Sequence, residues 1–377
     1  MPDDETLQAK NSSLRSAAKI KFDEFYTQYH DIEREMNAYL DFDKNAFHDK
    51  TILLPCDDPE WSNFTKYFAQ NFERLGLKKL ISTSYAPDSK PKELDLQLTL
   101  FETQSPKFNK GRTRTNGKIF TLTRDTTGDK KINVEDLEWE YLKGDGDFRS
   151  AEVTTLRDEA DIIITNPPFS LFREFLEWIV AADKKLVIIG NMNAITYREV
   201  FTLIRSNKIW LGNGFKGGAS EFISPRVQGN TESGPLQGSG LVKFGNVVWF
   251  TNLQHGRRHE PLVLMTQSDN IRFSKHKDIK GVGYKEYDNL KALDVPFTDA
   301  IPSDYPGLMG VPISFLSKYN PTQFEIVGTL NNGVQGDELG AVKLPITVKG
   351  KTFPWNGPIV DGKPQYFRIV IRHRRAA

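Results

Sequence analysis

The chain has 377 residues, of which 38% are hydrophobic and 26% are charged, and its formal net charge is +1. This composition is typical of a soluble protein with one large core or two moderate ones, and it excludes a strongly basic molecule. Any surface that binds nucleic acid must therefore be local. The single cysteine, Cys56, excludes an intramolecular disulfide and multi-cysteine metal sites, which indicates a reducing compartment such as the cytoplasm.

The beginning of the chain is polar, and residues 1–19 are expected to form a flexible tail. This segment has no apolar centre of the kind found in export signals. No run in the chain approaches the roughly 20 apolar residues of a membrane span. We therefore expect a protein that is neither exported by that route nor embedded in a membrane.

Short apolar runs alternate with helical periodicity from Thr51 onward. The expected strands are 51–55, 78–83, 161–165, 185–191, 208–212 and 246–253. The expected helices are 62–76, with Ser62 as its cap and Gly76 as its stop, 171–183 and 196–206. Strands that are apolar on both faces and separated by helices are typical of an α/β fold with a doubly wound, mainly parallel sheet.

An interruption at about 87–135 carries two segments with alternating hydrophobicity, 94–101 and 118–124. This pattern predicts an inserted β-hairpin whose tip spans 102–117. The tip carries four basic residues: Lys107, Lys110, Arg112 and Arg114. They are able to lie along a phosphate backbone, but an ordinary solvated hairpin explains them equally well.

From residue 254 the chain becomes rich in proline, glycine and short segments, so we expect a second, irregular region at 254–377 after a main domain at 20–253. The last segment, "YFRIVIRHRR", contains Arg368, Arg372, Arg374 and Arg375. It reads either as a basic edge strand that touches phosphates or as a solubilising terminus, with a slight preference for the former.

The stretch "TNPPF" places Asn166 where a buried strand of three isoleucines ends. Ligands of open α/β sheets bind at the carboxyl ends of the strands. Proline fixes its own φ and restricts the residue before it, so Pro167 and Pro168 make the carbonyl directions of this corner largely predetermined. The corner is therefore a candidate catalytic loop with rigid hydrogen-bond acceptors.

Such acceptors suit the methylation of an exocyclic amine, whose lone pair is delocalised and poorly nucleophilic. The side-chain oxygen of Asn166 and the carbonyl of Pro167 can hold the two N–H bonds, while Phe169 offers a face for stacking. Catalysis then requires positioning and electrostatic stabilisation rather than a metal or a covalent nucleophile. The alternative is that Asn-Pro-Pro only ends a strand.

A second group lies at "GDGDFRS", residues 144–150. Gly146 allows close approach of the backbone to a ligand, Asp147 can accept from an amino group, and Phe148 can pack on a ring. A glycine-rich turn with solvated acids is the alternative.

Two further segments are candidates for cofactor binding. Tyr26 and Thr27 can close over a cofactor, although such residues are more often part of a core. Asp57, which follows the first strand, can hold a ribose or a methionyl ammonium group, or it can belong to a capped turn.

Taken together, "DEFYTQ", "CDDP.WSNF.KYF", "GDGDFRS", "TNPPFSLF.E", "MGVPI.FL" and "YFRI" resemble the EcoRI-type adenine-specific DNA methyltransferases. The resemblance runs from about Lys21 to Arg372. It implies S-adenosylmethionine as methyl donor, an adenine flipped out of double-stranded DNA as acceptor, and N6-methyladenine as product. It also implies the modification enzyme of a type II restriction-modification system, a prokaryotic cytoplasm, and 254–377 as the target-recognition region.

Carried over by this resemblance, Asn166, Pro167 and Phe169 match the catalytic motif. Asp147 and Phe148 match the motif beside the adenine of the cofactor, and Tyr26 and Thr27 match the N-terminal cofactor segment. The usual glycine-rich first cofactor loop is absent, and "PCDDPEWS" occupies its place.

Because the target base must leave the duplex, the enzyme has to offset a few kcal/mol of unpairing and unstacking through contacts to DNA. The DNA-binding candidates are Lys107, Lys110, Arg112, Arg114, Lys216, Arg257 and Arg258, together with the C-terminal arginines. His255 and His259 lack the HExxH glutamate, so we expect no metal site there. We expect a monomer, because the two strands of a palindrome can be methylated in separate events.

Three other functions remain open on the sequence. The amine could belong to RNA or to a protein glutamine, since related NPP loops serve such enzymes. The chain could also be a DNA-binding homologue without activity, although an intact Asn166 argues against it. An NAD-dependent enzyme is disfavoured because no GxGxxG follows the first strand.

Overall fold

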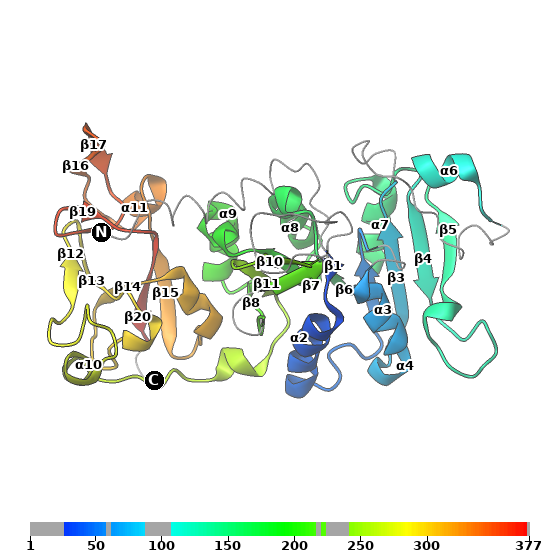
Figure 1. Cartoon of the computed structure of the whole chain (residues 1–377), viewed down its shortest axis with the longest axis horizontal. Coiled ribbons are helices and arrows are strands. Elements are labelled where there is room, and N and C mark those ends of the chain that lie inside the picture. Colours follow the sequence, from blue (N-terminus) through cyan, green and yellow to red (C-terminus); the bar gives the residue numbers. More distant parts are fainter. Residues whose placement is uncertain (1–25, 58–61, 87–106, 216–219, 224–240, 375–377) are drawn as a thin grey trace. The chain divides into compact units, whose positions relative to one another are not determined.

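A computed structural model describes residues 26–57, 62–86, 107–215, 220–223 and 241–374. The chain divides into two compact units (Figure 1). Unit 1 comprises residues 1–194 and 211–254, and unit 2 comprises 195–210 and 255–377. The domain limits expected from the sequence, 20–253 and 254–377, do not anticipate that 195–210 groups with the second unit.

Unit 1 is built on an eight-stranded sheet with the order β5-β4-β3-β2-β6-β7-β11-β8. Its strands, in that order, are Glu138–Tyr141, Lys118–Leu122, Lys79–Ser84, Thr51–Leu54, Ile162–Thr165, Lys185–Asn191, Val247–Thr251 and Trp210–Leu211. The four central strands β3, β2, β6 and β7 are parallel, whereas β4, β5 and β11 pair antiparallel. The sheet is therefore mixed, with the parallel centre that the sequence predicts.

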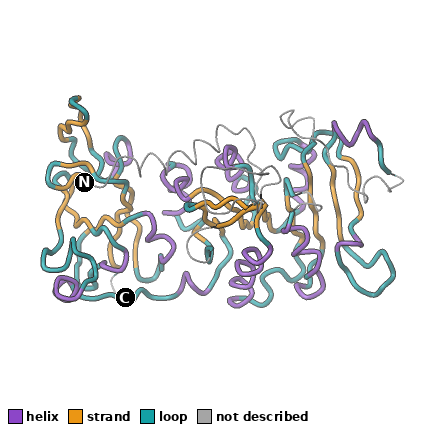
Figure 2. Tube along the Cα trace, in the orientation of Figure 1, coloured by secondary structure: helices purple, strands orange, loops and turns teal. Residues whose placement is uncertain are grey.

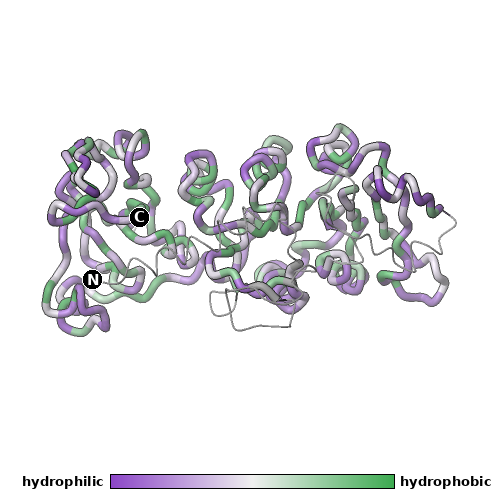
Figure 3. Tube along the Cα trace, turned by 45° about the horizontal axis from the view of Figure 1, so that its top comes forward, coloured by the Kyte–Doolittle hydropathy of each residue, from purple (hydrophilic) through white to green (hydrophobic). Residues whose placement is uncertain are grey.

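The central strands form because their residues are apolar on both faces. Every residue of β2 and β6 is buried. Among the described residues, the helices of unit 1 are α2 (Tyr29–Phe42), α3 (Asn63–Gln70), α4 (Phe72–Leu75), α6 (Lys110–Thr115), α7 (Ala151–Glu159) and α8 (Phe172–Val180). Hydrophobic and hydrophilic stretches alternate along the trace of unit 1 (Figure 3).

The predicted helix 62–76 is interrupted at Asn71 into α3 and α4. Its apolar face packs into the core as expected, and Phe64 and Phe68 are 1% and 0% exposed. Ser62 caps α3 by accepting a hydrogen bond from the Phe64 N–H, and Gly76 ends α4 with φ 62°. Glycine tolerates this left-handed conformation without steric cost.

In the part of 87–135 that the structure describes, the fold differs from the predicted hairpin insertion. Segment 118–124 contains β4, but β4 pairs with β3 and β5 and so extends the main sheet. Part of the expected tip is the helix α6, which begins after Asn109, because the Asn109 side chain accepts from the N–H groups of Gly111 and Arg112. The other expected strand, 94–101, lies outside the described residues.

A small sheet joins the beginning of the chain to a distant segment. It has the order β1-β9-β10, with β1 at Tyr26–Thr27, β9 at Ser220–Ile223 and β10 at Leu241–Phe244. Thr27 pairs with Phe222, and Asn63 at the start of α3 donates to the Thr27 carbonyl at 2.8 Å. The N-terminal segment is thus tied to the helix that follows β2.

Unit 2 is more regular than the sequence suggests. It holds a five-stranded sheet with the order β12-β13-β14-β20-β15, formed by Lys285–Tyr287, Leu290–Asp294, Leu308–Val311, Arg368–His373 and Phe324–Leu330. Two two-stranded sheets accompany it: β16 (Leu344–Val348) with β17 (Lys351–Trp355), and β18 (Ile359–Val360) with β19 (Lys363–Pro364). Its helices are α9 (Arg198–Arg205), α10 (Gln267–Phe273) and α11 (Val334–Glu338), and Figure 2 shows how loops separate these short elements.

The C-terminal strand β20 is not the edge strand that the sequence suggests. It lies between β14 and β15 and pairs antiparallel with both. Its Ile369, Val370 and Ile371 are fully buried. In the parts of the chain that the structure describes, no helix has the length and hydrophobicity needed to cross a membrane.

Candidate active site

The carboxyl ends of the four parallel strands meet at one edge of the sheet in unit 1. The polar residues in or just after these ends are Asp57 after β2, Ser84 in β3, Thr165 in β6 and Asn191 in β7. Asn166 follows Thr165 directly and is half-buried. In open α/β sheets this edge is where ligands bind, and it is where the sequence places the catalytic loop.

The Asn166-Pro167-Pro168 corner presents acceptors at this edge. The Oδ1 atom of Asn166 is buried, and Pro167 is buried beside it. The Pro168 carbonyl accepts from the Leu171 N–H at 2.9 Å, which opens the short helix Phe169–Leu171. No described residue donates a hydrogen bond to the Pro167 carbonyl. This carbonyl is therefore available to an N–H of a ligand.

A buried carboxylate holds the loop from below. Thr165 Oγ1 lies 2.5 Å from Asp57 Oδ2 and 2.8 Å from the Pro55 carbonyl oxygen. Ser62 Oγ donates to Asp57 Oδ1 at 2.7 Å, and Asp57 is only 5% exposed. Both carboxylate oxygens are thus engaged by hydroxyls. Hydrogen bonds to a charged group contribute about 1.5–3 kcal/mol, so this cluster fixes the residue that precedes Asn166.

The backbone at the end of β2 turns without a glycine. Cys56 adopts a left-handed conformation with φ 67°, which is uncommon for a residue with a side chain. Its N–H donates to Thr83 Oγ1 of β3 at 3.4 Å. Cys56 therefore makes the turn at the position where a glycine-rich cofactor loop is expected and absent.

The "GDGDFRS" segment packs against the end of β3. Gly146 has φ 86°, and a Cβ atom there would lie 2.3 Å from the Ser84 carbonyl oxygen. The close approach that requires glycine is thus to the β3 backbone. The Ala86 N–H also donates to the Asp145 carbonyl at 2.7 Å. These contacts bring the segment to the same edge of the sheet as Asn166.

The two predicted cofactor residues of this segment differ in environment. Arg149 Nη2 donates to Asp147 Oδ2 at 2.6 Å, and these hydrogen bonds lower the pKa of the Asp147 carboxyl. Phe148 is 3% exposed, and its ring packs edge-on against Phe175 and Trp178. Phe148 therefore contributes to the core under this edge, and Asp147 presents a charged carboxylate above it.

The burial and hydrogen bonding of the Thr27 hydroxyl test whether these residues suit a bound cofactor. It is 2% exposed, and its Oγ1 atom has no hydrogen-bond partner among the described residues. A buried hydroxyl without a partner is costly, and a polar ligand group removes that cost. Of its neighbour Tyr26 only the backbone is described, where it pairs with Ile223. The chemistry of the segment fits a ligand with both polar and apolar parts.

Glu35 joins the helix after Thr27 to another part of unit 1. Its side chain is fully buried and accepts from the N–H groups of Asn213 and Gly214, each at 2.9 Å, and from Tyr39 Oη at 2.6 Å. Burial raises the pKa of this carboxyl, although the three hydrogen bonds oppose that effect. The sequence gives no sign of this role for Glu35, because a lone glutamate in a helix carries no signal of burial.

The basic residues predicted on the hairpin tip lie on and beside α6. Lys110, Arg112 and Arg114 are exposed on this helix, and Arg112 stacks over the Tyr141 ring at 4.9 Å. Lys107 is exposed, with its Nζ 3.2 Å from the Trp139 carbonyl oxygen and 3.8 Å from Glu140 Oε1. The structure therefore gathers four cations on one part of unit 1.

The other residues predicted to contact DNA differ in how exposed they are. Lys216 lies outside the described residues. Arg257 is half-buried, but Arg258 is 3% exposed and stacks over the Trp210 ring at 3.8 Å. Burial lowers the pKa of Arg258 to about 10. The environment of Arg258 favours a structural role over a phosphate contact.

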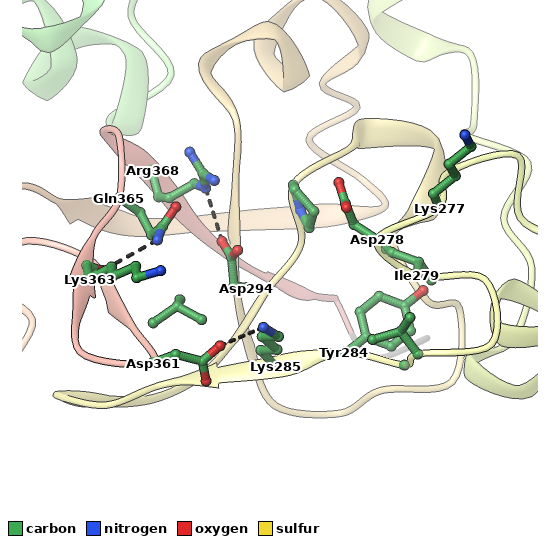
Figure 4. Close-up of a pocket in the computed structure, with 14 residues that line it drawn as sticks. Lys277, Asp278, Ile279, Tyr284, Lys285, Asp294, Asp361, Lys363, Gln365 and Arg368 are labelled. Atoms are coloured by element: carbon green, nitrogen blue, oxygen red, sulfur yellow. Dashed lines mark hydrogen bonds and ion pairs between the residues drawn. The ribbon is translucent and has the colours of Figure 1, made fainter. Parts of the chain in front are cut away.

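A cavity of about 430 Å³ in unit 2 contains charged residues in pairs (Figure 4). Arg368 Nε donates to Asp294 Oδ1 at 3.0 Å, and Lys285 lies beside Asp361. Outside this cavity, Arg372 donates to Glu325 Oε2 at 2.7 Å. Two of the C-terminal arginines are thus neutralised within unit 2, whereas Arg375 lies outside the described residues.

Three residues of the site were missed or only partly understood from the sequence. Thr165 carried no signal beyond its place at a strand end, and Ser62 was identified only as a helix cap. Asn63 connects α3 to the Thr27 carbonyl. Their roles depend on contacts between segments far apart in the chain, although polar residues at the ends of apolar strands are a usable signal.

Comparison with known proteins gives consistent matches over nearly the whole chain. The family model described as "Adenine-specific methyltransferase EcoRI" matches residues 13–374. The type II methyltransferase M.EcoRI of Escherichia coli is 39% identical over 370 residues, which cover 97% of this chain and 98% of that protein. M.MgeORF184P of Mycoplasma genitalium is 32% identical over 95% of this chain and 98% of its own length. M.MpnI of Mycoplasma pneumoniae is 30% identical over 95% and 97%, respectively. No solved structure gives a significant match.

Proposed function

The chain belongs to the EcoRI family of adenine-specific methyltransferases, and from this premise we propose that it methylates N6 of an adenine in double-stranded DNA. The methyl donor is S-adenosylmethionine, and the adenine is flipped out of the duplex into the site. The chain acts as the modification enzyme of a type II restriction-modification system. Its relatives carry the name of type II methyltransferases, which supports this role.

The loop at Asn166 holds the target amino group. The Asn166 side-chain oxygen and the Pro167 carbonyl accept its two N–H bonds, which draws the nitrogen toward tetrahedral geometry and restores its lone pair. Phe169, whose ring lies 6.2 Å from that of Phe244, stacks on the base. Because amide and carbonyl acceptors are neutral, they avoid placing an unpaired charge in a dry site.

We assign the cofactor-binding residues from their position at the same edge of the sheet. Thr27, Asp57 and Asp147 offer polar groups to the donor, with Tyr26 beside them and Phe148 beneath the segment of Asp147. When bound, S-adenosylmethionine supplies an electrophilic methyl group on its sulfonium. The residues of the chain orient the two substrates and exclude water, and no metal ion takes part.

The DNA contacts are proposed from charge. Lys107, Lys110, Arg112 and Arg114 neutralise phosphates in unit 1, and Arg257 is a further candidate in unit 2. Lys216 and Arg258 stay predictions from the sequence. The target-recognition role of 254–377 and the monomeric state are part of the same proposal.

The observation that carries the proposal is the Pro167 carbonyl, which belongs to a buried residue. It accepts no hydrogen bond from the described residues and stands at the ligand-binding edge beside Asn166. An acceptor of this kind is open to a donor from elsewhere, and an exocyclic amino group provides one.

The direct test supplies the purified chain with methyl-labelled donor and duplex DNA, RNA or unfolded protein in parallel. We expect label only in duplex DNA, recovered as N6-methyladenine. Methylation-aware sequencing of DNA from cells that express the chain should show one modified sequence context. Label in RNA or in protein glutamine, or none in duplex adenine, contradicts the proposal.

A further inference from the structure

The hairpin of β16 and β17 projects from the rest of unit 2 (Figure 1). Its strands pair from Leu344 with Trp355 to Val348 with Lys351. Most of its residues are exposed, and only Ile346 is fully buried, at 4% exposure. A two-stranded ribbon is marginally stable by itself in water. This ribbon is therefore held by its base and is exposed on most of its surface.

Buried amides clamp the base of the hairpin. Asn289 Nδ2 donates to the carbonyl oxygens of Val342 at 3.2 Å and Gly357 at 2.8 Å, which lie on either side of the hairpin. Asn356, which is fully buried, donates through Nδ2 to the Gly333 carbonyl at 2.9 Å and to Asp337 Oδ1 at 2.8 Å. These bonds fix the direction in which the ribbon projects.

The apex of the hairpin carries a lysine where other residues are favoured. Lys349 and Gly350 have φ 51° and 76°, as a two-residue turn with two left-handed positions requires. Asparagine, aspartate and glycine are preferred at the first of these positions, so lysine there costs some free energy. The sequence thus keeps a cation at the tip despite the conformation.

Every charged residue of the ribbon is a lysine. Residues 341–355 contain three lysines and no acid. Lys343, at the base, pairs with Asp337 at 3.3 Å. Lys349 and Lys351 are exposed, and neither forms an ion pair with a described residue. The tip therefore offers two cations to a polyanion.

The edges of the ribbon argue against a further strand as its partner. Pro345 and Pro354 lie opposite each other on one face, and proline has no N–H to donate to an added strand. Thr347 and Thr352 occupy the same face, with their hydroxyl oxygens 2.7 Å apart. This face offers hydroxyl groups to a polar partner rather than a backbone edge to a peptide.

We infer that the β16–β17 hairpin enters a groove of duplex DNA and contacts its phosphates through Lys349 and Lys351. The major groove admits a two-stranded ribbon, and threonine hydroxyls are able to contact base edges there. This inference rests on the proposed function, because it names a surface that binds the DNA substrate.

The test measures binding of a mixed-sequence DNA duplex by fluorescence anisotropy over a series of salt concentrations. Each lysine–phosphate contact contributes about 0.9 to the slope of log K against log salt. The double variant K349A/K351A should bind roughly tenfold more weakly and lower the slope by about 2. The variant K349R/K351R should retain both values, because arginine keeps the charge.

A matched control removes two lysines from a different exposed turn. K130A/K131A makes the same change in net charge in unit 1, where both residues are exposed. We expect it to change the affinity much less than the hairpin variant. Thermal unfolding should be the same for all three variants, since none of the replaced side chains is buried.

Unchanged affinity and slope in K349A/K351A overturn the inference, as does an equal loss in K130A/K131A. Methyl transfer by the wild-type chain separates this result from a failure of the proposed function. If the wild type methylates duplex adenine while the hairpin variants behave like it, only the hairpin inference is wrong. If the wild type neither binds nor methylates duplex DNA, both proposals are wrong.

Discussion

The carboxyl edge of the sheet in unit 1 and the β16–β17 hairpin in unit 2 place their polar groups in opposite ways. At the sheet edge, Asp57 and Thr165 are buried, and each makes more than one hydrogen bond. The hairpin is clamped at its base, by Asn289 and Asn356, and exposes Lys349 at its tip. Chemistry on a weak nucleophile requires groups with fixed positions, whereas contact with a long polyanion requires exposure. Variants in the two regions separate these two requirements.

The largest expected effect comes from Asn166→Ala. Loss of one oriented acceptor at the reacting nitrogen should lower kcat by roughly 10²–10³-fold. Binding of duplex DNA should remain, because the side chain lies at the sheet edge rather than among the exposed cations. Single-turnover methylation and anisotropy on the same protein give the two values.

Asn191→Ala, at the end of the neighbouring strand β7, is the matched control and should reduce turnover far less. Turnover by Asn166→Ala at the wild-type rate would remove the basis for the proposed chemistry.

Thr165→Val should have the next largest effect, with turnover about 10- to 100-fold lower, if the loss of a hydrogen bond worth about 1.5–3 kcal/mol is felt at Asn166. Thr165→Ser keeps the hydroxyl and should restore most of the activity. Asp57→Asn should lower turnover by a similar factor. In the double variant Thr165→Val/Asp57→Asn, the loss of turnover, expressed as a free energy, should be smaller than the sum of the two single losses.

The measured affinity for S-adenosylmethionine distinguishes two roles for Asp57, which are to position the catalytic loop and to contact the cofactor directly. A residue that only positions the loop leaves this affinity unchanged in both variants. A direct contact to the cofactor weakens it in Asp57→Asn but not in Thr165→Val.

Asn289→Ala tests the hairpin side of the comparison. The change leaves the carbonyls of Val342 and Gly357 without their donor, which should cost about 1–3 kcal/mol of stability in unit 2. Affinity for duplex DNA should fall severalfold as the ribbon loses its fixed direction, while kcat at saturating DNA stays near the wild-type value. Denaturant unfolding and steady-state kinetics provide the measurements, and a fall in kcat with unchanged affinity would contradict this assignment.

The smallest effect is expected from Glu35→Gln, measured as stability against pH. Because burial raises the folded-state pKa of Glu35 above its unfolded value, the contribution of this group is greatest below the unfolded pKa. That contribution is lost as the pH rises through the folded pKa. The wild type should therefore lose stability over this window, and Glu35→Gln should lose less. Thermal unfolding at a series of pH values checks this, and parallel curves for the two proteins would show that Glu35 does not titrate there.

Much of unit 1 was predictable because its strands are continuous apolar runs. Ile162, Ile163 and Ile164 have no polar face, so they indicate a strand in the middle of a covered sheet. The cap at Ser62 and the stop at Gly76 follow from local backbone chemistry. Asn166 could be placed at the ligand-binding edge for the same reason, since its position depends only on where its own strand ends.

Unit 2 was harder to predict because long-range pairs decide its structure. Arg368 suggested an exposed strand, but Asp294, which is distant in sequence, pairs with it and permits its burial. The helix α6 was missed because Lys110 and Gly111 in a polar stretch carry no apolar period. The hydroxyl contacts of Asp57 likewise join residues from separate segments, which periodicity does not reveal.

The membership of residues 195–210 in unit 2 has a consequence for how the protein can be altered. The helix α9 contacts β15, and Arg198 pairs with Glu338 at 2.9 Å. A fragment that starts at 255 lacks this helix, and a chimera that exchanges only the C-terminal part would join mismatched halves of one core. Replacing unit 2 by that of a relative therefore requires transplanting two separate stretches of the gene together.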